Sequence, residues 1–488
     1  FSRLLTNPVA ERRVEGVRGL SSYKHWDAQD KLIRLLDDAS PDVRRESVVA
    51  LCRLGTVTSI PSLIRCLREP SWEIRQNAWL GLCRMTAEQF PVDQPAQWET
   101  WWTNGCPALK EKKLLEALAA NPPPIPRRDA LRALRHFAGT HSETNLLAWI
   151  KSGMQPPPNV EELGFLAETF ERIGTSNAVP LLSHARLDAA AWALGRIGGP
   201  EAEKALLAFP KTLVTLLNLD RLGSTNAGPF IPYMIANMGL VTYRGQPDDL
   251  MNAERQPIQR VAANLILRSG RAPLLQELVL QELEDSMKPP VAHGPRPPAP
   301  PDWQRMLEQM REELKPGFVR GDGMTTSQPL VALCEIADDQ ALAPRLLPLL
   351  HHPAFVPRIY VAMLLGKLRA AAALPEMLKL IREGYAFSDA TALASGKHFD
   401  QSQTVRWRGF LCLALGRMGG DEACRALEQF AADPGQPRDI RYCSVVGLGF
   451  IGSPQSLPAL RKIAREDIIW MVRDEARRAV AEILLTSQ

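Results

Sequence analysis

Apolar side chains recur along this chain at every third or fourth position, in short stretches separated by polar or proline-containing turns. Val48, Leu51 and Leu54 form one such series, and residues 445–451 hold another. This spacing follows the 3.6-residue period of an α-helix with one buried face. No segment shows the alternation of apolar and polar residues that marks a β-strand, so the pattern predicts an all-α fold.

The helical stretches repeat with a nearly constant period. Arg13, Arg44 and Arg75 lie 31 residues apart. A second series follows with intervals of 33 and 32 residues, namely Arg408, Arg441 and Arg473. Each period is long enough for one helical hairpin with one apolar face. Such a hairpin can bury that face only by stacking on its neighbours, so the period predicts a repeat array.

Turn residues occupy matching positions within the repeats. A glycine lies 11 residues after the arginine in two copies, Gly55 and Gly452, where the end of a helix needs a residue that tolerates positive φ. A proline lies 17 residues after the same arginines, Pro61 and Pro458. Proline suits the first turn of a second helix, because its missing N–H costs nothing there. Ser40 precedes Pro41-Asp42 as a capping residue for the first helix.

This pattern resembles the HEAT-repeat family, in particular the short HEAT-like units of bacteria that are named after phycobilisome lyases. The resemblance implies an α-solenoid, which is a superhelix of stacked antiparallel helical hairpins. It rests on six segments: 40–68, 70–85, 358–381, 408–432, 441–464 and 470–485.

The resemblance also implies a role for the recurrent arginine. In this family it forms a structural ladder with acidic residues near helix starts, and Asp42 and Asp439 fit as partners here. The ladder positions in this chain are Arg44, Arg75, Arg408, Arg441 and Arg473. The functional alternative is that these arginines form a row that contacts phosphates.

Prolines indicate where the array is interrupted. The largest break has seven prolines within the fourteen residues 288–301, followed by a helical stretch and a glycine-rich segment. We therefore expect an N-terminal HEAT-like array over 1–287, a linker over 288–326 and a C-terminal HEAT-like array over 327–488. The linker is interpreted as an ordered surface connection, and the alternative is a docking segment for an SH3-like partner.

Composition narrows the class of protein. A net charge of +4 over 488 residues does not demand a polyanionic partner, and no apolar run approaches the ~20 residues that span a bilayer. None of the eight cysteines forms a CxxC pair, which favours reduced thiols in a core and hence a cytoplasmic location. Because the chain begins at Phe1, we expect its N-terminus to be processed or to lie outside this sequence.

Candidates for chemistry are few. The loop 320–323 lacks the ending of a phosphate-binding P-loop, and the pairs His351-His352 and His136/His141 lack the spacing of metal ligands. No nucleophile motif stands out, so we expect no catalytic residue, no metal and no cofactor.

Three inserts carry aromatic or arginine side chains outside the repeats. Residue types of this kind often anchor interfaces, because they bury much area at modest entropic cost. The candidate partner-binding residues are Trp98, Trp101, Trp102, Tyr243, Arg244, Tyr385, Phe387, His398 and Phe399. The alternative is that these aromatics fold back as local caps of the neighbouring hairpins.

The sequence therefore favours a non-catalytic scaffold or adaptor that binds another protein or protein complex, as a subunit of a larger assembly. Two other classes stay open. One is a HEAT-like enzyme of the chromophore-lyase or DNA-glycosylase type. The other is a nucleic-acid binder that uses its arginines against the phosphate backbone, although the low net charge weighs against it. The sequence does not indicate the partner, the pathway or the oligomeric state.

Overall fold

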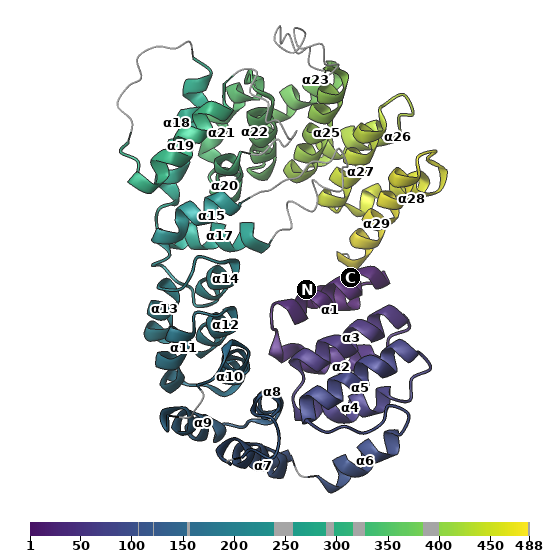
Figure 1. The fold of residues 1–488 in the computed structure, drawn as a ribbon. Coiled ribbons are helices and arrows are strands. Elements are labelled where there is room, and N and C mark those ends of the chain that lie inside the picture. The colour runs from purple at the N-terminus through teal and green to yellow at the C-terminus, as the bar shows by residue number, and fades with distance from the viewer. Residues whose placement is uncertain are drawn as a thin grey trace. The chain divides into compact units, whose positions relative to one another are not determined.

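The computed structural model describes residues 1–105, 107–120, 122–153, 157–238, 257–288, 297–315, 327–383 and 400–486. Within these ranges the chain folds into helices joined by turns, and they contain no strand. The chain divides into two compact units, unit 1 over Phe1–Leu222 and unit 2 over Gly223–Gln488. Figure 1 shows the succession of helices in each unit.

Unit 1 consists of α-helices connected by turns and short 3₁₀ helices. Its α-helices are α1 (Ala10–Ser22), α2 (Gln29–Arg34), α3 (Pro41–Leu54), α4 (Ile60–Cys66), α5 (Trp72–Thr86), α6 (Pro95–Asn104), α7 (Pro107–Ala119), α8 (Arg127–Phe137), α9 (Ser142–Lys151), α10 (Val160–Ile173), α11 (Val179–Ala185), α12 (Asp188–Ile197), α13 (Gly199–Leu207) and α14 (Leu213–Arg221). Its 3₁₀ helices are η1 (Ser2–Thr6), η2 (Trp26–Ala28), η3 (Leu35–Asp37), η4 (Val57–Ser59) and η5 (Ser176–Ala178).

Unit 2 is built in the same way. Its described α-helices are α15 (Ile231–Asn237), α17 (Pro257–Arg268), α18 (Ala272–Ser286), α19 (Pro301–Glu313), α20 (Gln328–Ile336), α21 (Ala343–Leu346), α22 (Phe355–Lys367), α23 (Leu374–Glu383), α25 (Asp400–Met418), α26 (Asp421–Ala432), α27 (Arg438–Ile451), α28 (Leu457–Glu466) and α29 (Trp470–Thr486). Its 3₁₀ helices are η6 (Gly228–Phe230), η7 (Gln340–Leu342), η8 (Leu347–His351), η9 (Ala371–Ala373) and η10 (Pro454–Ser456).

Stacking of equivalent helices holds each unit together. In unit 1, α1 packs on α3 and α3 packs on α5; in unit 2, α25, α27 and α29 follow one another in the same manner. The apolar positions read from the sequence lie in these contacts, and Val48, Leu51, Val445 and Leu448 are fully buried. The predicted all-α solenoid architecture is therefore confirmed within each unit.

The predicted turn glycines and prolines lie at helix ends, but the two glycines are required for different reasons. Gly452 ends α27 with φ of 68°, as predicted, and Pro61 and Pro458 lie in the first turns of α4 and α28. Gly55 does not adopt positive φ, since its φ is −64°. A side chain there would instead overlap Ser59 Oγ and the carbonyl of Leu51, so close packing explains this glycine. Both glycines end a helix, but for different physical reasons.

The cysteines behave as small core residues. All seven cysteines in the described part of the chain are free, and Cys66, Cys412, Cys424 and Cys443 are buried. Burial raises the pKa of the Cys66 thiol to about 12, which keeps it protonated and unreactive at neutral pH.

Contacts bridge the two sides of the proline-rich segment. Helix α18, which precedes it, packs against α19 and α20. Arg311 of α19 forms a bidentate ion pair with Glu282 of α18, with N···O distances of 2.9 and 2.6 Å. Arg345 likewise pairs with Glu277 and Glu284 of α18. The division into arrays at 288–326 stays a prediction.

Candidate functional site

The recurrent arginines point toward the backbone of the turn before their own helix. Arg44 Nη1 donates to the Asp38 carbonyl at 2.9 Å, and Arg473 Nη1 donates to the Asp467 carbonyl at 2.6 Å. The same bond to the carbonyl six residues earlier is made by two further arginines, Arg13 and Arg75. Each arginine thus fixes the chain entry to its own hairpin, because its charged donor binds a carbonyl of the turn that precedes the helix.

Several of these arginines also bind a carboxylate, which comes from the turn before the next hairpin. Arg13 binds Asp38 through two nitrogens, with distances of 2.8 and 2.7 Å. Arg13 and Asp38 are 25 residues apart, and nearly the same spacing relates two other pairs, Arg44–Glu69 and Arg441–Asp467. The contacts therefore form a ladder that links successive hairpins.

The acidic partners differ from those that the sequence suggested. Asp42 pairs with Arg45 at 3.3 Å, and Asp439 pairs with Arg438 at 2.9 Å, so neither faces a ladder arginine. The reason is geometric: both carboxylates lie in the first turn of the same helix as the arginine, on a different face. The partner has to come from the following hairpin.

Arg408 also binds a backbone carbonyl and a side chain from the next turn, but that side chain is a neutral amide. Its Nε donates to the Ile381 carbonyl at 2.6 Å, and its Nη2 donates to Gln436 Oε1 at 2.7 Å. An amide oxygen thus replaces the carboxylate, and the bond links α25 to the turn before α27. The structural role of the ladder residues stays a prediction, which substitution of Arg441 tests below.

The tryptophan insert forms α6 and lies partly inside the fold. Trp98 is fully buried and meets Phe90 and Trp101 edge-to-face, with ring centroids 5.0 and 6.1 Å apart. Trp101 and Trp102 are half-buried and line a small cleft of about 80 Å³ beside Lys110. Trp98 therefore lies as a local cap would, whereas Trp101 and Trp102 retain exposed surface.

The other insert candidates lie outside the described residues. These are Tyr243, Arg244, Tyr385, Phe387, His398 and Phe399. Their role in partner binding stays a prediction.

The two histidine pairs have separate environments. His351 Nε2 lies 3.2 Å from Glu376, whereas His352 is buried and contacts Ser286. His136 is buried, and His141 is exposed on the rim of a groove. Among the residues that the structure describes, no three His, Cys, Asp or Glu side chains are grouped as metal ligands would be.

His352 gives the first testable expectation. Its Nδ1 accepts the Ala354 N–H at 3.0 Å, so its Nε2 carries the proton and donates to Ser286 Oγ at 2.7 Å. Burial lowers the pKa of His352 to about 4. The unfolded chain therefore binds this proton first, so stability falls as the pH drops below about 6.5.

We expect this residue to remove about 2 kcal/mol of unfolding free energy between about pH 7 and pH 5. Urea unfolding at both pH values should show a smaller loss in His352→Gln than in the wild type. His351→Gln is the control, because that side chain is half exposed. An unchanged pH dependence in His352→Gln would contradict the assignment.

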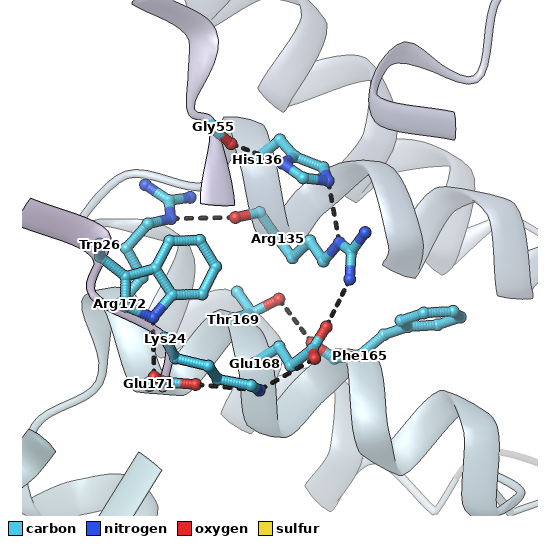
Figure 2. A network of polar contacts seen from close by, with 10 residues as sticks. All are labelled: Lys24, Trp26, Gly55, Arg135, His136, Phe165, Glu168, Thr169, Glu171 and Arg172. Atoms are coloured by element: carbon cyan, nitrogen blue, oxygen red, sulfur yellow. Dashed lines mark hydrogen bonds and ion pairs between the residues drawn. The ribbon is translucent and has the colours of Figure 1, made fainter. Parts of the chain in front are cut away.

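A polar network in unit 1, shown in Figure 2, joins segments that are far apart in sequence. Trp26 of η2 donates its indole N–H to Glu171 Oε1 of α10 at 2.7 Å. Lys24 Nζ lies 3.0 Å from Glu168 and 3.3 Å from Glu171. The first hairpin is thereby bound to a helix about 145 residues later in the chain.

Helix α8 extends this network. Arg135 Nη1 pairs with Glu168 at 2.5 Å, and Arg135 Nε donates to His136 Nε2 at 2.8 Å. Because that nitrogen accepts, His136 Nδ1 carries the proton and donates to the Gly55 carbonyl at 2.6 Å. Burial lowers the pKa of His136 well below its usual value, so the ring is neutral. This histidine ties α8 to the end of α3.

Direct contacts with cations and an indole N–H offset the burial of the two carboxylates in this network. Burial raises the pKa of Glu171, whereas at Glu168 the neighbouring Lys24 and Arg135 outweigh burial and lower the pKa. Burial lowers the pKa of Arg172 to about 10, and this side chain donates to the Arg135 carbonyl at 2.9 Å. Each of the four carboxylate oxygens of Glu168 and Glu171 contacts Lys24, Arg135 or Trp26, so every one of them has a partner within the network.

This network could not be predicted from the sequence. Its partners come from hairpins that are not adjacent in the sequence, and no local pattern relates them. The burial of Glu171 in α10 is unusual for a carboxylate, but it is visible only in the structure.

Unit 1 contains a groove of about 1210 Å³ among α7, α8 and α9. Leu115, Leu118 and Leu146 contribute apolar surface, and Trp149 lies beside them with its indole N–H bonded to the Leu118 carbonyl at 3.0 Å. Polar side chains surround this floor: Lys112, Glu116, Arg128, His141 and Asn145. The groove combines an apolar floor with a mixed-charge rim, which is typical of an interface rather than of a catalytic pocket.

Comparison with known proteins agrees with the fold. Residues 1–83 and 392–481 match a family model for HEAT repeats, and residues 187–209 match one for the PBS lyase HEAT-like repeat. No curated protein matches this chain. A solved structure that describes Kap95p binding to RanGDP in nuclear import complex assembly aligns with 13% identity and a TM-score of 0.33. The alignment covers 98% of this chain, which spans 66% of that one.

Among the described residues, no helix combines the length and the hydrophobicity needed to cross a bilayer. The family matches fall on both ends of the sequence and on α12–α13, and they agree with the stacked hairpins and the arginine ladder. This chain therefore contains segments that match HEAT repeats in its first and last parts, and a segment between them that matches the PBS lyase HEAT-like repeat.

Proposed function

We propose that this chain is a non-catalytic scaffold that binds another protein, as a subunit of a larger assembly. The observation that carries this proposal is the groove among α7, α8 and α9, which has an apolar floor and a volume of about 1210 Å³. Pockets for small molecules usually measure about 300–1,000 Å³, so this groove suits a peptide segment better than a small substrate. Stacked helical repeats commonly bind partners along such extended surfaces.

The groups around the groove favour recognition over chemistry. Arg127 forms a bidentate ion pair with Glu162, at 2.8 and 2.6 Å, and Glu111 accepts bonds from Gly139 N and Ser142 Oγ. These charges position α8, α9 and α10. Lys112, Arg128 and Asn145 are exposed, and the ion pairs of Lys112 and Arg128 are long, at 3.6–3.8 Å, so a ligand's polar groups can reach them.

The remaining surface of the neighbouring insert extends this contact area. Trp101 and Trp102 lie on α6 and line a cleft with Leu109 and Lys113 of α7, the same helix that lines the groove. We include them in the proposed interface, and the insert residues outside the described ranges stay separate candidates for partner binding. Trp98 is excluded from direct contact, because its side chain is fully buried.

A pair of matched variants on α9 tests the proposal. Asn145 is exposed and lines the groove, whereas the adjacent Thr144 is exposed and does not line it. Asn145→Trp should fill the groove and weaken binding of the co-purifying partner at least about tenfold, which corresponds to about 1.4 kcal/mol. Thr144→Trp should leave binding unchanged. The measurement is quantitative affinity purification of each full chain from the source cells, followed by titration of the partner.

Three outcomes would contradict the proposal. Equal binding by both variants would remove the groove from the interface. A free monomer that retains a bound small molecule would favour the enzyme class, and co-purifying nucleic acid that is released by salt would favour the phosphate-binding class.

A further inference from the structure

The last two helices form a second groove, in unit 2, whose chemistry differs from that of the first. It measures about 480 Å³ and lies between α28 and α29. Four of its six lining residues are arginines: Arg461 and Arg465 from α28, and Arg473 and Arg477 from α29. The members of each pair are four residues apart, so they share one helix face and direct two rows of positive charge into the groove.

Three acidic residues of the same hairpin have partners outside the groove. Asp467 is buried against Arg441, Glu475 accepts a bond from Tyr442, and Asp474 lies 3.1 Å from Arg478. Within the described part of the chain, Arg461 and Arg465 form no ion pair. Arg477 has only a long contact of 3.8 Å with Asp474. The six residues that line the groove therefore include four cations and no carboxylate.

The arginine ladder indicates which anion suits this position. Arg473 binds the carbonyl six residues before it, as Arg13 and Arg44 do. Arg13 and Arg44 also bind a carboxylate from the turn before the next hairpin.

Two exposed apolar residues precede the groove arginines of α29 in the sequence. Trp470 begins α29 three residues before Arg473 and is 66% exposed, and Ile468 in the preceding turn is 83% exposed. Exposed tryptophan beside arginine is typical of the centre of a protein interface.

We propose that the groove between α28 and α29 binds an acidic helical segment of a partner protein, one of whose carboxylates binds Arg473 in the way that Asp38 binds Arg13. Arg461, Arg465 and Arg477 hold further carboxylates, and Trp470 packs against the apolar side of the segment. A nucleic acid fits less well, because nucleic-acid binding relies on many phosphate contacts and this groove offers four arginines on one hairpin. This groove shares no lining residue with the groove of unit 1, so either proposal can fail without the other.

The test uses a labelled, capped alanine-based helical peptide with four glutamates spaced four residues apart. Its binding to the full chain is followed by fluorescence anisotropy at low ionic strength. We expect the double variant Arg461→Ala/Arg465→Ala to weaken binding at least about tenfold. The matched control is Arg425→Ala/Lys462→Ala, which removes the same charge from exposed positions of α26 and α28 outside the groove. It should weaken binding less than about twofold, and both variants should keep the wild-type melting temperature.

Other probes distinguish the alternatives. The same peptide with glutamine in place of glutamate should not bind. The proposal is overturned if the glutamate peptide fails to bind, or if both double variants weaken it equally, which would indicate general electrostatic attraction. It is also overturned if a thymidine oligonucleotide binds more tightly than the peptide through the same arginines, because the surface would then recognise phosphates.

Discussion

Replacing Arg441 by alanine is expected to lower the free energy of unfolding by about 3 kcal/mol. Arg441 and Asp467 are both almost fully buried, and their ion pair links α27 to the turn before α29. Removing the guanidinium leaves the Asp467 carboxylate buried without its cation, and it also removes a bond to the Ala431 carbonyl. Urea unfolding of the full chain, followed by circular dichroism at neutral pH, measures the effect.

Arg438→Ala is the matched control on the same helix. Arg438 pairs with Asp439, but its side chain is 47% exposed, so its loss should cost less than about 1 kcal/mol. If Arg441→Ala kept the wild-type stability and abolished partner binding, the ladder arginines would be binding residues and their structural assignment would be wrong.

Glu171→Ala is expected to destabilise unit 1 by a similar amount, about 3 kcal/mol. The change removes the acceptor of the buried Trp26 indole N–H and one of the two carboxylates that compensate Lys24. Glu161→Ala on the same helix is the control, because Glu161 is exposed and lies 3.8 Å from Arg128. Thermal and urea unfolding compare the two variants.

Glu171→Gln separates the hydrogen bond from the charge. The amide oxygen can still accept from Trp26, so this variant should lose less stability than Glu171→Ala. Equal stability of Glu171→Ala and Glu161→Ala would mean that the network contributes nothing measurable to unit 1, and it would reopen a functional role for its buried charges.

The fold could be predicted because its signals are local and periodic. The spacing of Arg44 from Gly55 and Pro61 is set within one hairpin, so it is visible in the sequence. Local spacing could not show which contact each of these residues makes. Gly55 is required by contact with Ser59, and the carboxylate beside Arg44 comes from Glu69 of the next turn rather than from Asp42.

The candidate surfaces were less predictable, because burial depends on packing between elements. Trp98 and Trp101 are three residues apart, yet only Trp98 is fully buried, since it meets Phe90 from the preceding turn. The four arginines between α28 and α29 looked like ordinary surface charges in the sequence. Their significance depends on three acidic residues of the same hairpin having partners outside the groove, as Asp467 has in Arg441.

The contact of Trp26 with Glu171 changes how unit 1 should lose its structure. In an open repeat array each hairpin touches only its neighbours, so end hairpins can detach one at a time. Here the first hairpin is held by α10 as well as by α3, and its release breaks two sets of bonds together. Amide protons of α1 should therefore exchange with solvent at rates close to those of α10, rather than at the faster rates of a fraying end. A pulling force applied at the N-terminus would likewise have to break the contacts with α3 and α10 together, instead of detaching single hairpins one after another.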